Sequence, residues 1–195
     1  MGVMEISSGS LRIMRIAIVL IFSLILLQGC FPKIGKTMDK FFYSNVTEIE
    51  MIKFALSHKK ISDYGTMESI HFWMIANMTW EQDSWGGFLD YPRDAKRTLK
   101  RKRGDCEDFS GLAIEVLKRN NIESFYFAVL EDSEKIIKKG HVVCLVKLNN
   151  SYYHIGNYKK LYGPYNNYKS VASSIFPKWK TYEVKDYNFK TINKN

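Results

Sequence analysis

The stretch RKRGDCEDFSGLAIEVLKRN, residues 101–120, predicts a helix that carries a cysteine in its first turn. Gly104 ends a preceding helix, Asp105 is a capping residue, and Cys106 begins a helix that runs to about Asn120. The apolar residues of this helix recur with helical spacing and form a stripe, which comprises Phe109, Leu112, Ala113, Val116 and Leu117. We therefore expect a helix with one buried face and with Cys106 in its first turn.

Helical patterns also precede this stretch. The predicted upstream helices are residues 47–60, 66–80 and 93–102. Thr47 and Glu50 form a capping box at the first of them, and Thr66 is the expected cap of the second. The first helix has one apolar face, made by Ile49, Ile52 and Leu56. Helices therefore fill the first part of the domain.

After Asn121 the period of the hydrophobic pattern changes to two, which indicates strands. The predicted strands are SFYFAVL (124–130), HVVCLVKL (141–148), SYYHIGNY (151–158) and KTYEVKDY (180–187). Helices followed by antiparallel strands are typical of an α+β domain, in which the helix that carries Cys106 packs on the sheet.

The N-terminus has the pattern of a secretory signal. Arg12 and Arg15 precede twelve mostly aliphatic residues, 16–27, a segment too short to span a membrane comfortably. Leu27-Gln28-Gly29-Cys30 resembles the lipobox of bacterial lipoproteins, in which the cysteine is diacylated and becomes the first residue. An uncleaved N-terminal anchor is the alternative.

This pattern predicts the domain organisation and the location of the protein. We expect a signal peptide at residues 1–29, the lipidated Cys30 with a tether at 30–45, and the domain at 46–195. Lipid chains attach a protein to a membrane without a spanning helix. The protein is therefore expected to be a membrane-anchored lipoprotein on the extracytoplasmic side.

The chain is basic, with a formal net charge of +9. An ordinary solvated surface accounts for this charge, and an anionic membrane surface or polymer is the alternative partner. No nucleic-acid partner is expected, because lysines and aromatic residues form no ordered stripe. The composition, 46% hydrophobic and 25% charged, is that of a globular protein.

The cysteine count leaves few roles open. If Cys30 carries lipid, only Cys106 and Cys144 remain, too few for a disulfide framework. A single Cys106–Cys144 disulfide stays open in an oxidising compartment, as does a zinc site formed by both cysteines and His141. Because Cys144 and His141 face opposite sides of one strand, a small buried apolar role is favoured for Cys144.

Cys106 lies at a predicted helix start, which is one feature of the environment of a reactive thiol. The N–H groups and dipole of a helix start stabilise a thiolate, although the flanking carboxylates oppose it. A nucleophile also needs a base within reach and a third group that orients the base. His141, at the start of a strand, is the candidate base, and Asn157 on the next strand is the candidate third group.

The segments YPRDAKRTLKRKRGDCEDFSGLA (91–113), GHVVCLV (140–146) and YYHIGNY (152–158) together resemble the transglutaminase-like superfamily, including its bacterial cysteine peptidases. The resemblance implies a papain-like fold, with Cys106 as nucleophile, His141 as general base and acid, and Asn157 as the orienting group. The sequence departs from the family pattern in two places: Val142-Val143 replaces the usual aromatic residue after the histidine, and Asn157 replaces the commoner aspartate.

Strand parity provides a test of Asn157. A two-residue turn at Asn149-Asn150 pairs residue 157 with Val142, so that Asn157 points away from His141. A three-residue loop, 149–151, places it on the His141 face. We therefore predict a three-residue loop or a bulge, and a plain two-residue turn favours His154 or another partner.

Other residues near the predicted site have structural interpretations as well. Asp105, Glu107 and Asp108 are expected to cap the helix, and the resemblance offers Ca²⁺ binding as an alternative; no other cofactor is expected. Packing is favoured over a cleft wall for Trp80, Trp85 and Tyr91, and His58 and His71 are expected at the surface or its boundary.

The expected function is an exported thiol enzyme that acts on peptide or carboxamide bonds. Its expected partner is a protein or peptide, including cell-wall peptide. Hydrolysis is favoured over cross-linking because bacterial members of the family are often peptidases. The alternative function is a catalytically inactive binding module at the cell envelope.

Overall fold

The structure is a computed structural model that describes residues 47–82, 94–132 and 140–195. The predicted signal peptide, Cys30 and the tether lie outside the described residues, as do Trp85 and Tyr91. Among the helices in the described ranges, none has the length and apolar character needed to cross a membrane.

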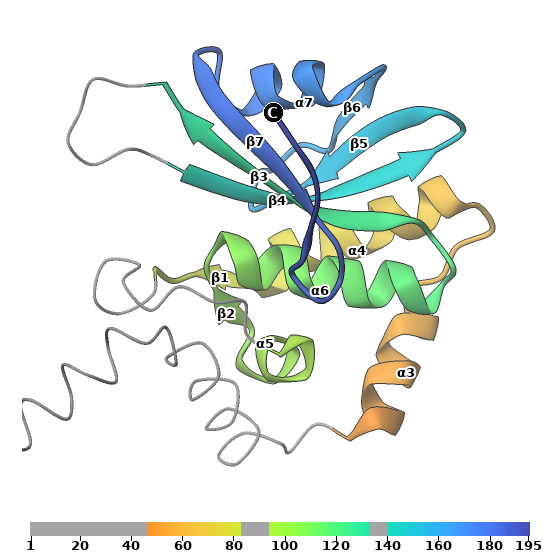
Figure 1. Ribbon diagram of the computed structural model, residues 1–195. Helices are drawn as coiled ribbons and strands as arrows, with labels where there is room; N and C mark the ends of the chain where they lie inside the picture. The colour runs from red at the N-terminus through yellow and green to blue at the C-terminus, as the bar shows by residue number, and fades with distance from the viewer. Residues whose placement is uncertain (1–46, 83–93, 133–139) are drawn as a thin grey trace, which may run out of the picture.

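The centre of the molecule is a six-stranded sheet in which neighbouring strands are antiparallel (Figure 1). In spatial order its strands are β6 (Tyr162–Tyr165), β5 (Ser151–Ile155), β4 (Gly140–Leu148), β3 (Ser124–Glu131), β7 (Trp179–Lys185) and β8 (Thr191–Lys194). The four predicted strands are confirmed, although β5 ends three residues earlier than its pattern indicates, at Ile155. The strands β6 and β8 at the two edges were not predicted.

Helices cover both faces of this sheet. The helices are α3 (Glu48–Ser57), α4 (Asp63–Asn77), α5 (Ala95–Arg101), α6 (Cys106–Arg119) and α7 (Tyr168–Ile175). The helix α6 packs on β3 and β4, with α3, α4 and α5 around it, and α7 lies on the other side of the sheet (Figure 1). This arrangement confirms an α+β domain with the cysteine-bearing helix against the sheet.

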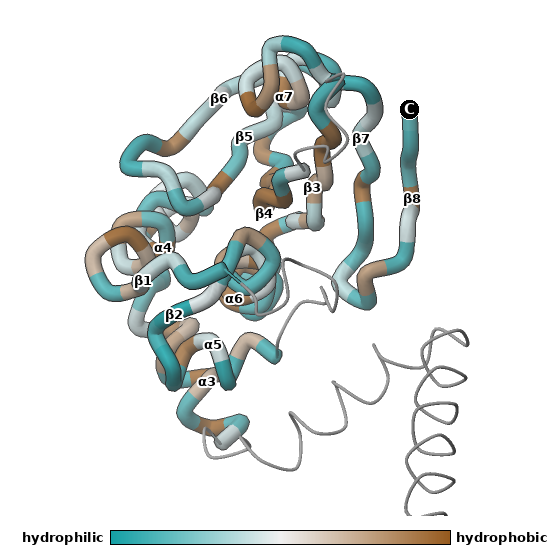
Figure 2. Tube along the Cα trace, turned by 90° about the vertical axis from the view of Figure 1, so that its left-hand side faces the viewer, coloured by the Kyte–Doolittle hydropathy of each residue, from teal (hydrophilic) through white to brown (hydrophobic). Residues whose placement is uncertain are grey.

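The alternation of side chains along β4 divides the core into two layers. Cys144 and Val146 are fully buried toward α6, where they meet the predicted stripe of that helix. Val143 and Leu145 are fully buried on the other face, toward α7. Figure 2 shows the hydrophobic part of the trace along β4 in the middle of the molecule. The middle of β4, which begins two residues after His141, therefore lies between two packed layers.

Two helix predictions need correction. The helix α4 begins at Asp63, and its cap is Ser62, whose Oγ accepts the N–H of Gly65 over 3.0 Å. Thr66 is buried inside the helix, where its hydroxyl donates to the carbonyl of Ser62. On α3 the predicted capping box is confirmed, but Met51 and Ala55 form the buried face. The predicted apolar face is exposed; it comprises Ile49, Ile52 and Leu56.

A short parallel pair of strands positions the start of α6. In this pair β1 (Thr79–Trp80) follows α4 and β2 (Arg103–Gly104) precedes α6. The N–H of Glu81 donates to the carbonyl of Gly104 over 2.8 Å, which extends the pairing to the residue before the cap of α6. The ends of α4 and α5 are therefore tied together just before Cys106.

Candidate active site

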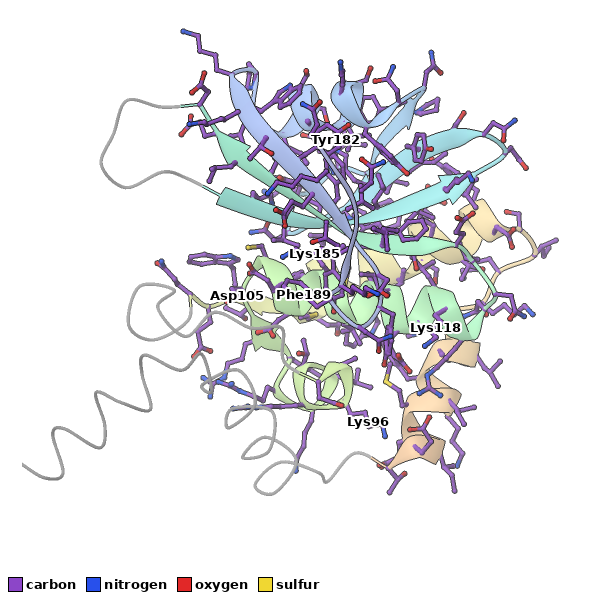
Figure 3. The ribbon with its side chains drawn as sticks, viewed as in Figure 1. Lys96, Asp105, Lys118, Tyr182, Lys185 and Phe189 are labelled. Carbon is purple, nitrogen blue, oxygen red and sulfur yellow. The ribbon has the colours of Figure 1, made fainter. Side chains whose placement is uncertain are left out.

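The start of α6 is fixed by two carboxylates. The N–H of Asp108 donates to Oδ1 of Asp105, and the N–H of Asp105 donates to Oδ2 of Asp108, each over 3.3 Å. This reciprocal pattern is a capping box, and it confirms Asp105 as the cap of the helix. Gly104 fits closely against it, because a Cβ at that position would lie 2.3 Å from Oδ2 of Asp108. In Figure 3 Asp105 lies at the N-terminal end of α6.

Cys106 is the first residue of α6, and its thiol donates a hydrogen bond to Oε2 of Glu107 over 2.9 Å. Burial raises the pKa of the Cys106 thiol strongly, and the charge and hydrogen bond of Glu107 raise that pKa further. The backbone N–H of Val142 acts in the opposite direction and favours the thiolate. The resting thiol is therefore protonated, and it lies beside the residue that follows His141.

His141 is half-buried near the start of β4. Burial lowers the pKa of its imidazole, and the charge of Glu107 counteracts part of this effect. Its Nε2 atom is buried without a hydrogen-bond partner among the residues that the structure describes. Glu107 thus acts on both the thiol and the imidazole, because its carboxylate raises the pKa of each. No hydrogen bond links Cys106 and His141 within the described ranges.

The turn between β4 and β5 differs from the predicted loop. Leu148 pairs with Ser151, so the turn contains only Asn149 and Asn150. Both asparagines have positive φ angles, 48° and 63°, as a tight turn between twisted antiparallel strands requires. The prediction of a three-residue loop was therefore wrong. Asparagine adopts the left-handed conformation more readily than most residues, which makes the shorter turn favourable here.

The register of β4 and β5 determines whether Asn157 shares the sheet face of His141. The last pair of the β4–β5 ladder is Cys144 with Ile155, and its continuation places Gly156, not Asn157, on the face that His141 shares. Asn157 follows the end of β5, in a bend. Its role as the orienting group stays a prediction that the register does not support.

His154, the expected substitute, is engaged elsewhere. It is buried, and its Nε2 lies 3.0 Å from Oγ of Ser174 on α7. Its ring stacks on Tyr162 with centroids 5.1 Å apart and planes 2° apart, and Tyr165 lies on it at 5.9 Å. Because Ser174 gives its own proton to the carbonyl of Val171, the imidazole is the donor in the bond to Ser174. His154 is therefore held by α7 rather than by His141.

The remaining predicted residues have mixed outcomes. Cys144 is fully buried, as predicted, and both Cys106 and Cys144 are free thiols, so that no disulfide joins them. His71 is fully buried in α4, contrary to its expected surface position, whereas His58 lies at the boundary. Trp80 is half exposed.

Each of the three carboxylates at the start of α6 has a hydrogen-bond partner within the chain. Asp105 and Asp108 cap the helix, and Glu107 accepts the proton of the thiol. Across residues 47–82, 94–132 and 140–195, the structure contains no group of three or more His, Cys, Asp or Glu side chains that could hold a metal ion. Binding of Ca²⁺ by these residues stays a prediction.

Two features of the site were missed by reasoning from the sequence. One is the hydrogen bond from the thiol to Glu107, which pattern alone does not reveal. The other is Tyr158, whose ring lies 5.4 Å from that of His141 at an angle of 62°. Counting the strand register through an Asn-Asn turn of two residues would have directed attention to Gly156 and the residues that follow it.

Comparisons with known proteins agree with this architecture. The family model of the transglutaminase-like domain matches residues 42–186. A comparison with curated proteins finds no match. The calcium-bound structure of LapG from Legionella pneumophila is similar, with a TM-score of 0.50 and 14% identity; the alignment covers 76% of this chain and 80% of LapG. At this identity the likeness demonstrates the shared fold.

Two other solved structures are more distant and longer. A candidate cysteine protease from Cytophaga hutchinsonii aligns with a TM-score of 0.46 and 14% identity over 83% of this chain. A candidate protease from Parabacteroides distasonis aligns with a TM-score of 0.44 and 12% identity over 70% of this chain. This chain spans 54% of the first protein and 31% of the second.

Proposed function

The chain belongs to the transglutaminase-like domain family, and from that premise we propose that it is a thiol enzyme that acts on peptide or carboxamide bonds. One observation carries the proposal. Cys106 occupies the first turn of α6, and its thiol lies against the backbone N–H of Val142, the residue that follows His141 in the chain. Acyl transfer by a thiol requires a base that can come within hydrogen-bond reach of the nucleophile, and His141 is the candidate for that role.

The proposed reaction begins with the proton of the thiol. His141 takes this proton, and the Cys106 sulfur attacks the carbonyl carbon of the substrate to form a new C–S bond. The backbone N–H of Cys106, at the start of α6, stabilises the negative charge on the carbonyl oxygen. His141 then gives its proton to the leaving amine as the C–N bond breaks.

The thioester that results is resolved by a second attack. Water or an acceptor amine loses its proton to His141 and attacks the same carbonyl, which releases the product and restores the thiol. We favour hydrolysis over cross-linking, and a peptide substrate, including cell-wall peptide. The orienting role expected of Asn157 is left out of this proposal, because the strand register gives it no support.

The location of the enzyme is proposed from its N-terminal sequence. The lipobox-like segment that ends at Cys30 supports a diacylated cysteine and a membrane-anchored protein on the extracytoplasmic side. Retention of the chain in a detergent phase, with loss of retention in Cys30→Ser, tests the anchor. If Cys30→Ser is retained equally, the lipid is not the anchor.

The central test combines labelling with turnover. The full chain, purified in detergent, is exposed to a thiol-directed electrophile and to a library of peptides and carboxamides. Cys106→Ala is expected to abolish both labelling at residue 106 and turnover, and Cys144→Ala is the control because that thiol is fully buried against α6. Turnover that survives in Cys106→Ala would overturn the proposal.

One observation favours a second function, that of a catalytically inactive binding module. The Cys106 thiol is bonded to Glu107, and its pKa is raised, which disfavours a thiolate. A binding module predicts that His141→Ala leaves the reactivity of Cys106 unchanged, whereas a thiol enzyme predicts a loss. The same labelling experiment therefore separates the two functions.

A further inference from the structure

The first position after β5 that shares the sheet face of His141 has no side chain, because it is Gly156. The pairing of Cys144 with Ile155 continues by one step to Val143 and Gly156, and Val143 shares its face of the sheet with His141. A third catalytic residue on this strand would stand at 156. The glycine there supplies neither a carboxylate nor an amide to the imidazole.

A tyrosine ring fills the space beside this glycine. A Cβ atom at Gly156 would lie 2.8 Å from Cε2 and 3.0 Å from Cδ2 of Tyr158, and 3.4 Å from Cγ1 of Val143. The φ angle of Gly156 lies outside the left-handed region, so its backbone conformation does not itself require glycine. The ring of Tyr158 is what excludes a side chain at 156.

The same ring packs against the candidate base. Its centroid lies 5.4 Å from that of His141, with the planes at 62°. Two further rings hold Tyr158 in place: Tyr162 at 5.5 Å and 75°, and His154 at 6.0 Å and 77°. All three contacts have the edge-to-face geometry that aromatic rings prefer. The ring of Tyr158 is thus held by Tyr162 and His154 and packs against the imidazole of His141.

We propose that Tyr158 is the positioning residue of His141 and replaces the third catalytic residue on β5. Packing against the ring limits rotation of the imidazole, and the negative face of an aromatic ring favours the imidazolium that forms when His141 accepts the proton of the thiol. Nε2 of His141 has no hydrogen-bond partner within the described residues, which agrees with orientation by packing. This inference rests on the proposed function.

Alkylation of Cys106 by iodoacetamide tests the inference without knowledge of the substrate. The rate is followed at residue 106 by peptide mass spectrometry on the full chain between pH 6 and 9. Tyr158→Leu is expected to lower the rate at neutral pH by about tenfold and to shift its pH profile upward, because the base is misplaced. Tyr158→Phe keeps the ring, so its alkylation rate and its pH profile are expected to match those of the unchanged protein.

A double-mutant cycle separates positioning from general destabilisation. In a His141→Ala background, Tyr158→Leu is expected to cause no further loss, because the two residues act as one unit. A second variant displaces the ring without removing it: Gly156→Ala introduces the contact of 2.8 Å with Tyr158. Gly140→Ala is its control, because the nearest atom to a Cβ there is 3.8 Å away.

The outcomes distinguish this inference from the proposed function. If His141→Ala does not change the rate, the thiol–imidazole pair itself fails. If His141→Ala lowers the rate but Tyr158→Leu and Gly156→Ala do not, only the role of Tyr158 is overturned. A loss in Tyr158→Leu of equal size with and without His141 also overturns it. If Tyr158→Leu does not fold, Gly156→Ala takes its place in the double-mutant cycle with His141→Ala, and Tyr158→Phe stays the control that keeps the ring. An alkylation rate that is unchanged in Gly156→Ala then overturns the role of Tyr158.

Discussion

The thiol of Cys106 donates its proton to the carboxylate of the next residue, Glu107, over 2.9 Å. This contact places a negative charge beside a group that must itself become negative in order to react. The helix start and the N–H of Val142 favour the thiolate, but burial and Glu107 outweigh them and raise the pKa of the thiol. Burial and Glu107 therefore act together to favour the protonated form of Cys106.

Replacement of Glu107 by glutamine should make Cys106 more reactive. The variant removes the charge and weakens the acceptor, so the pKa of the thiol falls and the thiolate fraction rises by about tenfold for each pKa unit. The rate of alkylation by iodoacetamide at pH 7.5 should increase accordingly. Glu123→Gln removes an equal charge that pairs with Lys147 at the surface and should leave the rate unchanged. An unchanged rate in Glu107→Gln would show that burial alone sets the reactivity.

The capping box should contribute measurably to stability. Asp105→Ala removes the acceptor for the N–H of Asp108 at a buried helix start, and it should lower the free energy of unfolding by about 1 kcal/mol. Urea titrations measure the change. Thr47→Ala removes the corresponding cap of α3 at an exposed site and should cost less. Equal losses in the two variants would contradict a special role for burial of the α6 cap.

Features set by local sequence were predictable. The start of α6 at Cys106, its capping box and its buried stripe all depend on residues within one helix, and each is confirmed. The face of α3 was predicted wrongly because the exposed stripe of Ile49, Ile52 and Leu56 looks like a core face in the sequence. The elements β6 and α7 were not predicted. Gly163 and Pro164 obscure the strand, and the helix is only eight residues long.

The site was less predictable because it depends on register and on contacts between distant segments. One residue more or less in the turn after Leu148 decides whether Asn157 or Gly156 shares the sheet face of His141, and the turn contains two residues. The burial of His71 depends on what packs over α4. No periodicity within a single segment contains this information.

Substitution of Asn150 by glycine should stabilise the hairpin of β4 and β5. Asn150 has a φ of 63° in a two-residue turn, a conformation that costs glycine less than asparagine. The free energy of unfolding should rise by about 0.5 kcal/mol, because relief of a left-handed backbone penalty of about 1 kcal/mol is only partly offset by the greater entropy of glycine in the unfolded chain. Insertion of one glycine after Asn150, which creates the three-residue loop, should instead lower it, because the register of β5 is lost. A stabilising insertion would show that the longer loop is the native one.

Acid should destabilise the protein through His154. Burial lowers the pKa of this imidazole from 6.5 in the unfolded chain to about 4 in the folded protein. Between these values the unfolded state binds the proton and the folded state does not. The contribution to stability is therefore complete above pH 6.5 and is lost progressively as the pH falls toward 4. Because the side chain is 1% exposed, the loss is on the order of 3 kcal/mol.

Urea titrations at several pH values between 4 and 7 measure this loss. His154→Phe keeps an aromatic ring between Tyr162 and Tyr165 but cannot be protonated, so its stability should depend less steeply on pH in this window. Tyr162→Phe preserves the stacking and the titrating imidazole and should retain the slope of the unchanged protein. Because burial also lowers the pKa of His71 and His141, part of the slope should persist in His154→Phe. A slope identical to that of the unchanged protein would exclude His154 as its source.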